Sequence, residues 1–304
     1  MDGITISCII PCSAKDFESE KLQDLISSIR NQEFPQDQIE ILTVTEGDSE
    51  SAKAIGIRRA KGEICAMFCA DNMITDTNLF NDVQAHFDQF EFVNGLYPEQ
   101  YTYTPTDNSL NRYFSLIGGN DPVCYYLGKN DRVPHVLTLE RTSSYPKSYG
   151  CNGTFYRTAE IRKTDLDNYY PMDNAMEVGT VYPIPGDSIW HRTSDSFLTF
   201  LKKRYRYAKE LYCDRGNRRW RMLDTREDYW KLLFFIVATL TIAEPISVSI
   251  RGFKHIRDWA WFWHPIVCWG FLITYGVLTL RTLFVRLLSQ RWEDLNPFRP
   301  LSKA

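Results

Sequence analysis

The sequence predicts an α/β fold with a mainly parallel β-sheet flanked by helices, followed by a C-terminal pair of membrane-spanning helices. Short β-branched apolar runs alternate with helical patterns near the N-terminus, which is typical of a parallel sheet. Two long apolar runs lie in the last third of the chain, and each approaches the length that crosses a bilayer. A chain of 304 residues can hold one large domain and an appendage.

The expected sheet begins at residues 4–10, a β-branched apolar run that Pro11 closes. Apolar side chains recur at helical spacing over residues 22–29, and Phe34-Pro35 ends that helix. A strand, a helix and a third strand follow at residues 39–44, 51–60 and 64–68. Ligands bind beyond the carboxyl ends of such strands, so we expect a site at three loops, residues 11–15, 45–49 and 69–72.

The C-terminal apolar runs cover residues 232–250 and 259–280, and the second contains no Asp, Glu, Lys or Arg. The loop at 251–258 is too short to hold a domain, so the two runs predict a transmembrane hairpin. Buried helices of a globular protein are the alternative. Glu244 is costly within a membrane, and Pro245 beside it allows a kink, an interfacial segment or a re-entrant segment instead of a span.

Charge suggests the orientation and excludes one class of partner. The net charge of -3 argues against nucleic acid as a partner. Residues 202–221 carry nine Lys or Arg against two acids, which favours a catalytic domain on the cytoplasmic side of a cell membrane. The N-terminus, MDGITISCIIP, does not resemble a signal peptide, and the eight scattered cysteines indicate reduced thiols. We therefore expect a catalytic domain, a basic juxtamembrane segment, the hairpin and a cytoplasmic tail at residues 1–200, 201–228, 229–288 and 289–304.

One acid stands out before any family is considered. In Cys69-Ala70-Asp71-Asn72 the Asp71 carboxylate directly follows the third strand, where a ligand would bind. A divalent cation that holds a diphosphate needs such an oxygen ligand, and phosphates and water complete its shell. A turn or a helix cap is the structural alternative for this sequence.

Three segments follow one another in the first 70 residues, ISCIIPCSAKD, LQDLISSIRNQEFP and EILTVTEGDSESAKAIGIRRAKGEICAMFCADN. In their order and spacing they resemble an inverting family 2 glycosyltransferase of the GT-A fold. The resemblance extends over residues 4–207 and is faint between 80 and 149. The resemblance implies a GT-A-like sheet, a nucleoside diphosphate sugar (a UDP- or GDP-sugar) as donor, and Mg or Mn as cofactor.

The resemblance assigns the donor and metal contacts to individual residues. Asp71 matches the last acid of the Asp-x-Asp motif and would bind the metal, with Asn72 beside it. Glu46 would contact the nucleoside and Lys53 the phosphates, while Pro11 closes the first strand on the donor side. A solvated loop acid and an exposed helix lysine are the structural alternatives for Glu46 and Lys53. A late histidine of such enzymes often reaches the metal, and His191 matches it.

The sequence also departs from the family pattern. The first Asp of the motif is Cys69, the first strand-end acid is Thr45, and the helix Asn is Ala54. These departures motivate a catalytically inactive scaffold or binding subunit as an alternative function. A polysaccharide synthase is a further alternative, which two spans disfavour because they are too few to enclose a channel.

The resemblance places the acceptor site in two segments. Residues 149–157 match a stretch that lines the acceptor side, and Asn152, Gly153 and Arg157 are its candidate residues. In Lys203-Arg204-Tyr205-Arg206-Tyr207 the last two residues match a degenerate acceptor motif. The same segment also fits an amphipathic interfacial helix.

Direct displacement requires a carboxylate that accepts the proton of the attacking hydroxyl. Asp173 is the candidate base and Glu177 is the runner-up, whereas Asp165 or Asp167 replaces them if the alignment slips. The expected activity is metal-assisted, inverting sugar transfer to a membrane-associated acceptor such as a lipid-linked sugar, a polyprenyl phosphate or a glycan precursor.

Overall fold

The computed structural model describes residues 3–13, 17–136, 152–214 and 218–288. Contacts divide the chain into two compact units. Unit 1 comprises Met1–Pro105 and Asn130–Arg192, and unit 2 comprises Thr106–Lys129 and Thr193–Ala304. Residues 106–129 therefore group with the C-terminal helices, although the sequence placed them in the N-terminal domain. The tail expected at 289–304 lies outside the described residues.

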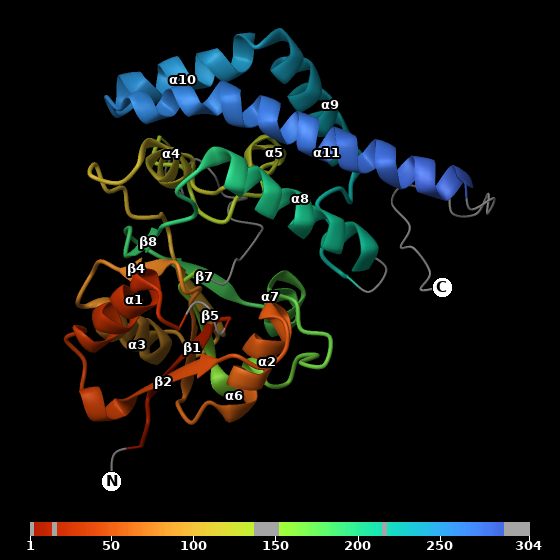
Figure 1. Ribbon diagram of the computed structural model, residues 1–304. Helices are drawn as coiled ribbons and strands as arrows, with labels where there is room; N and C mark the ends of the chain where they lie inside the picture. The colour runs from red at the N-terminus through yellow and green to blue at the C-terminus, as the bar shows by residue number, and fades with distance from the viewer. Residues whose placement is uncertain (1–2, 14–16, 137–151, 215–217, 289–304) are drawn as a thin grey trace. The chain divides into compact units, whose positions relative to one another are not determined.

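A sheet forms the centre of unit 1 (Figure 1). It has six strands in the order β2-β1-β3-β6-β5-β7. Its strands are β1 (Ile6–Pro11), β2 (Ile39–Val44), β3 (Ile64–Met67), β5 (Gly95–Pro98), β6 (Thr154–Arg157) and β7 (Val181–Ile184). Neighbouring strands are parallel except that β6 runs antiparallel to β3 and β5. The predicted mainly parallel sheet is confirmed, and β2 has the predicted bounds.

Helices cover both faces of this sheet. They are α1 (Glu20–Arg30), η1 (Gln36–Gln38), α2 (Ser49–Arg59), α3 (Leu79–Gln89), α6 (Thr158–Ile161) and α7 (Pro171–Val178). Side-chain caps start the first two long helices, since Ser19 accepts a hydrogen bond from the N–H of Leu22 and Asp48 accepts from Glu50 and Ser51. The bonds from Ser51, together with one from Glu50, lower the pKa of Asp48 below its usual value.

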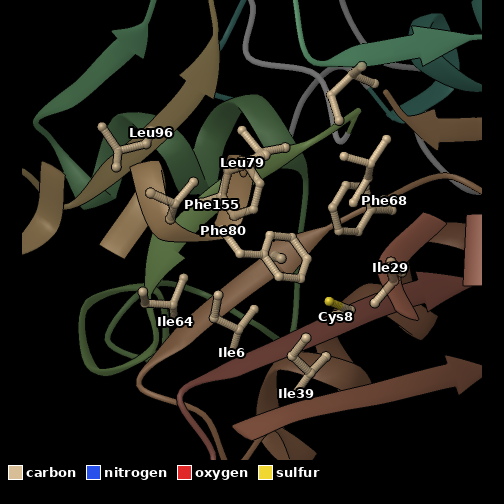
Figure 2. Packing of buried hydrophobic residues seen from close by; sticks show 14 of the residues in the cluster. Ile6, Cys8, Ile29, Ile39, Ile64, Phe68, Leu79, Phe80, Leu96 and Phe155 are labelled. Carbon is tan, nitrogen blue, oxygen red and sulfur yellow. The ribbon is translucent and has the colours of Figure 1, made fainter. Parts of the chain in front are cut away.

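Alternate residues of β1 point into two different layers. Ile6, Cys8 and Ile10 join α1 and α3 in one core cluster, which Figure 2 shows. Ile9 joins residues of α2, α6 and α7 in the other cluster. This alternation explains why β1 reads as a continuous apolar run, because both of its faces are buried.

Unit 2 is helical. Its elements are α4 (Ser109–Ile117), α5 (Pro122–Leu127), α8 (Phe197–Asp214), α9 (Arg226–Thr241), α10 (Ala243–His255), η4 (Trp259–Phe262) and α11 (Trp263–Leu288). Residues 259–284 are long and apolar enough to cross a membrane. The first predicted span is not one straight helix, because α9 and α10 meet at an angle of 87°.

The break between α9 and α10 lies at Ile242, which has a positive φ of 58°. A β-branched residue rarely adopts this left-handed conformation, so the break is a defined structural feature rather than a gentle kink. Glu244 follows it and is bonded, since it accepts hydrogen bonds from Tyr126 and from Arg251. These partners, both within unit 2, offset the cost of placing the Glu244 carboxylate in an apolar segment.

Candidate functional site

The carboxyl ends of the first three strands meet at one edge of the sheet. Pro11 lies opposite Val44 in the register of β1 and β2, and Ile9 lies opposite Met67 in that of β1 and β3. The predicted loops after these strands therefore leave the same edge. Residues 14 and 15 of the first loop lie outside the described residues.

Asp71 lies at this edge, immediately before β4 (Asn72–Ile74). Strand β4 pairs antiparallel with β8 (Ile189–His191), and the register sets Asn72 opposite His191. The Nε2 atom of His191 lies 3.6 Å from Oδ1 of Asp71. The Asp71 side chain is 20% exposed and that of His191 is 10% exposed, while the Oδ1 atom of Asp71 is itself buried.

A series of hydrogen bonds between buried polar groups lies beside this pair. Asn72 accepts a hydrogen bond from the N–H of Cys69 at 2.8 Å and donates one to Asn152 at 3.2 Å. Asn152 in turn donates to the hydroxyl of Tyr101 at 3.1 Å. The Tyr101 ring lies 5.3 Å from the His191 ring, measured between centroids. We call Asp71, Asn72, Tyr101, Asn152 and His191 the polar cluster.

No sequence pattern predicted Tyr101 or the residues Asp131, Arg132 and His135 that support it. Arg132 is fully buried, donates to the carbonyl of Asn152, and lies 5.1 Å from the centre of the Tyr101 ring. The Tyr101 hydroxyl donates to Asp131 at 3.4 Å, and His135 bonds the Tyr101 carbonyl at 2.7 Å. Burial and the nearby Asp131 charge raise the pKa of Tyr101, so its hydroxyl stays protonated. These residues lie in or near a segment without clear periodicity, where no sequence signal marked them.

The Asp71–His191 pair has the donor atoms that a divalent cation requires. Two ligands at about 2.0–2.2 Å from one ion can stand up to about 4 Å apart, and 3.6 Å falls within that limit. Across the described part of the chain, no cluster of three or more His, Cys, Asp or Glu residues is arranged to hold a metal. Two protein ligands fit an ion that shares its remaining positions with water and phosphate oxygens, as Mg²⁺ and Mn²⁺ commonly do.

The other predicted donor residues have different environments. Pro11 ends β1 at the same edge. Glu46 is half exposed and paired with Arg59 at 2.8 Å, and the hydrogen bond from Arg59 lowers the pKa of Glu46. Lys53 is not an exposed helix lysine, because its side chain is 3% exposed and its Nζ bonds Glu50 at 2.9 Å.

Two of the predicted acceptor residues serve the fold of unit 1. Gly153 has a φ of 69°, and a Cβ atom there would lie 2.5 Å from the side chain of Ile189. Only glycine therefore fits beside β8. The Arg157 guanidinium donates to the carbonyls of Val93 and Phe87 at 2.8 and 2.6 Å. Residues 149–151 of the same motif lie outside the described residues.

Arg206 and Tyr207 belong to unit 2, where both are exposed on α8. The neighbouring Arg204 lies over the rings of Phe200 and Tyr207, at 5.6 and 5.8 Å from their centres. Phe200 and Arg204 also contact the Phe271 ring of α11, so their side of α8 packs within unit 2.

The four candidate bases differ in how they are bonded. Asp173 is buried in the first turn of α7. Glu177 accepts a hydrogen bond from the N–H of Asp165 at 2.9 Å, and Asp165 itself accepts from the N–H groups of Asp167 and Asn168. Asp167 pairs with Arg58 on the surface. The bonds of Glu177, Asp165 and Asp167 thus order the turn that precedes α7.

The chain is similar in structure to three sugar-transferring or sugar-binding proteins at low identity. A mannosyltransferase from Pyrobaculum calidifontis, in complex with GDP-Man and Mn²⁺, is 12% identical with a TM-score of 0.45 over 97% of this chain and 82% of that chain. TarS 1-349 of S. aureus in complex with UDP-GlcNAc is 12% identical with a TM-score of 0.41 over 97% and 90%. Glucosyl-3-phosphoglycerate synthase from Mycobacterium tuberculosis, in complex with Mn²⁺ and UDP-glucose, is 10% identical with a TM-score of 0.41 over 68% and 78%.

No protein-family model and no curated protein matches the sequence. The conclusions that follow therefore rest on the residues of this chain.

Proposed function

We propose that this protein is a metal-dependent glycosyltransferase that moves a hexose from a UDP- or GDP-sugar to a membrane-associated acceptor. The observation that carries the proposal is the Asp71–His191 pair, which lies at the carboxyl edge of a parallel sheet on a scaffold of buried hydrogen bonds. A carboxylate and an imidazole at that edge form a suitable site for a cation and a diphosphate.

Each residue of the site has a proposed task. Asp71 and His191 would hold Mg²⁺ or Mn²⁺, which supplies positive charge to the diphosphate leaving group when bound. Asn72 and Asn152 keep Asp71 and His191 in position through their mutual hydrogen bond. Glu46 and Pro11 border the nucleoside side of the edge. Lys53 is buried and bonded to Glu50, so we assign it to the support of α2 rather than to phosphate contact.

The reaction is a direct displacement with inversion, as in family 2 enzymes. The acceptor hydroxyl forms a bond to the anomeric carbon, the bond from that carbon to the diphosphate oxygen breaks, and the nucleoside diphosphate leaves with the electron pair. Asp173 accepts the hydroxyl proton. We prefer it to Glu177, Asp165 and Asp167 because Asp173 lies in the segment that matches the acidic catalytic motif of the family.

The acceptor is proposed to be lipid-linked and presented at the cytoplasmic face of a cell membrane. The support is the apolar helix at residues 259–284 together with the basic helix α8 of the same unit. Arg206 and Tyr207 are exposed on α8 and are proposed to contact the acceptor. Arg157 is left out of this proposal because its guanidinium already bonds backbone carbonyls.

The decisive experiment measures nucleoside diphosphate release by the detergent-purified full chain with Mn²⁺ or Mg²⁺ and a panel of UDP- and GDP-sugars. We expect Asp71→Asn to lower turnover on the order of 100-fold, because a metal ligand is lost. Asp88→Asn, which alters an exposed acid on α3, is the matched control and should keep wild-type turnover.

Equal turnover in the wild type and in Asp71→Asn would refute the assigned metal site. Absence of both turnover and metal-dependent nucleotide binding, measured by calorimetry, would instead favour the inactive scaffold that Cys69 motivates. The two outcomes are distinct because calorimetry reports binding without chemistry.

A further inference from the structure

Unit 2 exposes many large apolar side chains on its last three helices. On α9 the exposed residues recur at helical spacing and are Trp230, Leu233, Phe234, Val237 and Leu240. On α11 the exposed apolar residues are Ile266, Ile273, Val277, Leu280 and Phe284, which also form one stripe. Ile242, Ile246 and Ile250 add a third stripe along α10. We call these residues the apolar face. Exposed apolar side chains in this number indicate an interaction surface.

A second, adjacent face of α11 is packed against a charged helix. Phe197 of α8 lies 5.5 Å from the Trp263 ring, and Phe200 lies 5.8 Å from the Phe271 ring. Further along, Arg281 of α11 donates to the hydroxyl of Tyr205 at 3.0 Å. Side chains between Phe197 and Tyr205, about 12 Å of the α8 axis, thus contact α11 residues from Trp263 to Arg281.

This packing is incompatible with a lipid-surrounded α11 that crosses the bilayer. A crossing α11 would place Phe271 close to the middle of a hydrocarbon layer about 30 Å thick. Lys202 and Lys203 are exposed and stand between the α8 residues that contact Phe271 and Arg281. Their ammonium groups would then lie near the bilayer centre, where charge is least tolerated.

The geometry of α9 and α10 also argues against a membrane crossing. Helix α9 has 16 residues and α10 has 13, which correspond to about 24 and 20 Å, and they meet at 87°. Neither helix alone spans about 30 Å of hydrocarbon. Basic residues Arg251, Lys254 and Arg257 at the end of α10 are exposed, as they would be beside anionic headgroups.

We infer that unit 2 is embedded in only one leaflet of a lipid bilayer, with α11 lying along the membrane and its apolar face in the acyl chains. Charged α8 then stays on the water side of α11, and no helix of unit 2 crosses. The inference rests on the membrane association in the proposed function but not on its chemistry. It differs from the hairpin expected from hydropathy, which placed residues 251–258 on the far side.

The test uses double-cysteine variants of the full chain reconstituted in sealed phosphatidylglycerol–phosphatidylcholine vesicles and treated with a membrane-impermeant maleimide-polymer. Lys61→Cys, exposed in unit 1, is paired with Lys254→Cys or with Ala304→Cys. If both cysteines lie on the same side of the membrane, every molecule reacts with two maleimide-polymer tags or with none, whatever its orientation in the vesicle. If they face opposite sides, every molecule gains one tag.

We expect two or no added tags for both pairs, after subtraction of the wild-type labelling of the natural cysteines. The control pair Lys61→Cys with Asp88→Cys lies wholly in unit 1 and must give the same pattern. One tag with Lys254→Cys would show that α9 and α10 cross, and one tag with Ala304→Cys would show that α11 crosses; either overturns the inference. A protein that fails to bind vesicles and self-associates instead also overturns it, whereas the nucleoside diphosphate assay tests the chemistry independently.

Discussion

Asp173 and Glu177 stand one turn apart on α7, and substitution of each tests which one acts as the base. Asp173 is buried in the first turn, and Glu177 accepts a hydrogen bond from the N–H of Asp165 at 2.9 Å. We expect Asp173→Asn to lower kcat about 10²- to 10⁴-fold with little change in the donor KM, because proton transfer fails while donor binding remains. Glu177→Gln should keep kcat within a few-fold of the wild type.

The measurement is steady-state transfer to the acceptor, accompanied by donor binding to each variant. A large loss of kcat in Glu177→Gln with normal kcat in Asp173→Asn would exchange the two roles. Equal kcat in both variants would remove both residues from the chemistry.

At the scale of elements, one buried ion pair ties α5 to α9 and sets a pH dependence of stability. Lys129 Nζ lies 2.9 Å from Asp228 Oδ2, and both side chains are nearly buried. Burial opposes ionisation of Asp228, but hydrogen bonds from Thr225, Asp224 and Lys129 outweigh it and lower its pKa from the ordinary 3.8 to about 2. The depressed pKa means that this stabilisation is present above about pH 4 and disappears as the pH falls through 2.

We therefore expect Asp228→Asn to destabilise the protein by about 3 kcal/mol at pH 7, because the buried ammonium of Lys129 loses its counter-charge. The difference in unfolding free energy between Asp228→Asn and the wild type should become smaller as the pH falls from about 4 towards 2. Thermal unfolding in detergent across this range is the measurement. Glu227→Gln is the matched control because it removes an exposed acid from the same helical turn, and a pH-independent difference for Asp228→Asn would contradict the assigned ion pair.

At the scale of the whole molecule, membrane binding and donor hydrolysis are expected to depend on different units. Phe234 and Val237 are 54% and 51% exposed on α9. Phe234→Ser with Val237→Ser removes apolar area worth about 2 kcal/mol of membrane affinity, so binding to vesicles should fall more than tenfold. Hydrolysis of the donor in detergent should be unchanged, since Asp71 and His191 lie in unit 1.

Co-sedimentation with vesicles and nucleoside diphosphate release measure the two properties separately. Phe92→Ser, which removes an exposed aromatic ring from unit 1, is the control and should leave vesicle binding intact. Unchanged vesicle binding in the α9 variant would show that the apolar face serves another purpose.

Much of the framework follows from local sequence patterns. The β-branched runs predict β1, β2 and β3, and the helical spacing of Leu22, Leu25 and Ile29 predicts α1. The position of Asp71 follows as well, because the end of a buried strand can be read from the change from apolar to polar residues. The support of Asp71 cannot be read in this way, since Tyr101, Asn152 and His191 reach it only through long-range strand pairing.

The sequence by itself determined the order of the N-terminal strands and helices, the strand-end acid and the apolar character of the C-terminal third. Only the tertiary structure decided that residues 106–129 pack with the C-terminal helices. It also decided that α9 ends and α10 begins at Ile242, and that charged α8 covers one face of α11. The physical reason is that hydropathy records how apolar a segment is, while the partner of each helix face depends on contacts between residues far apart in the chain.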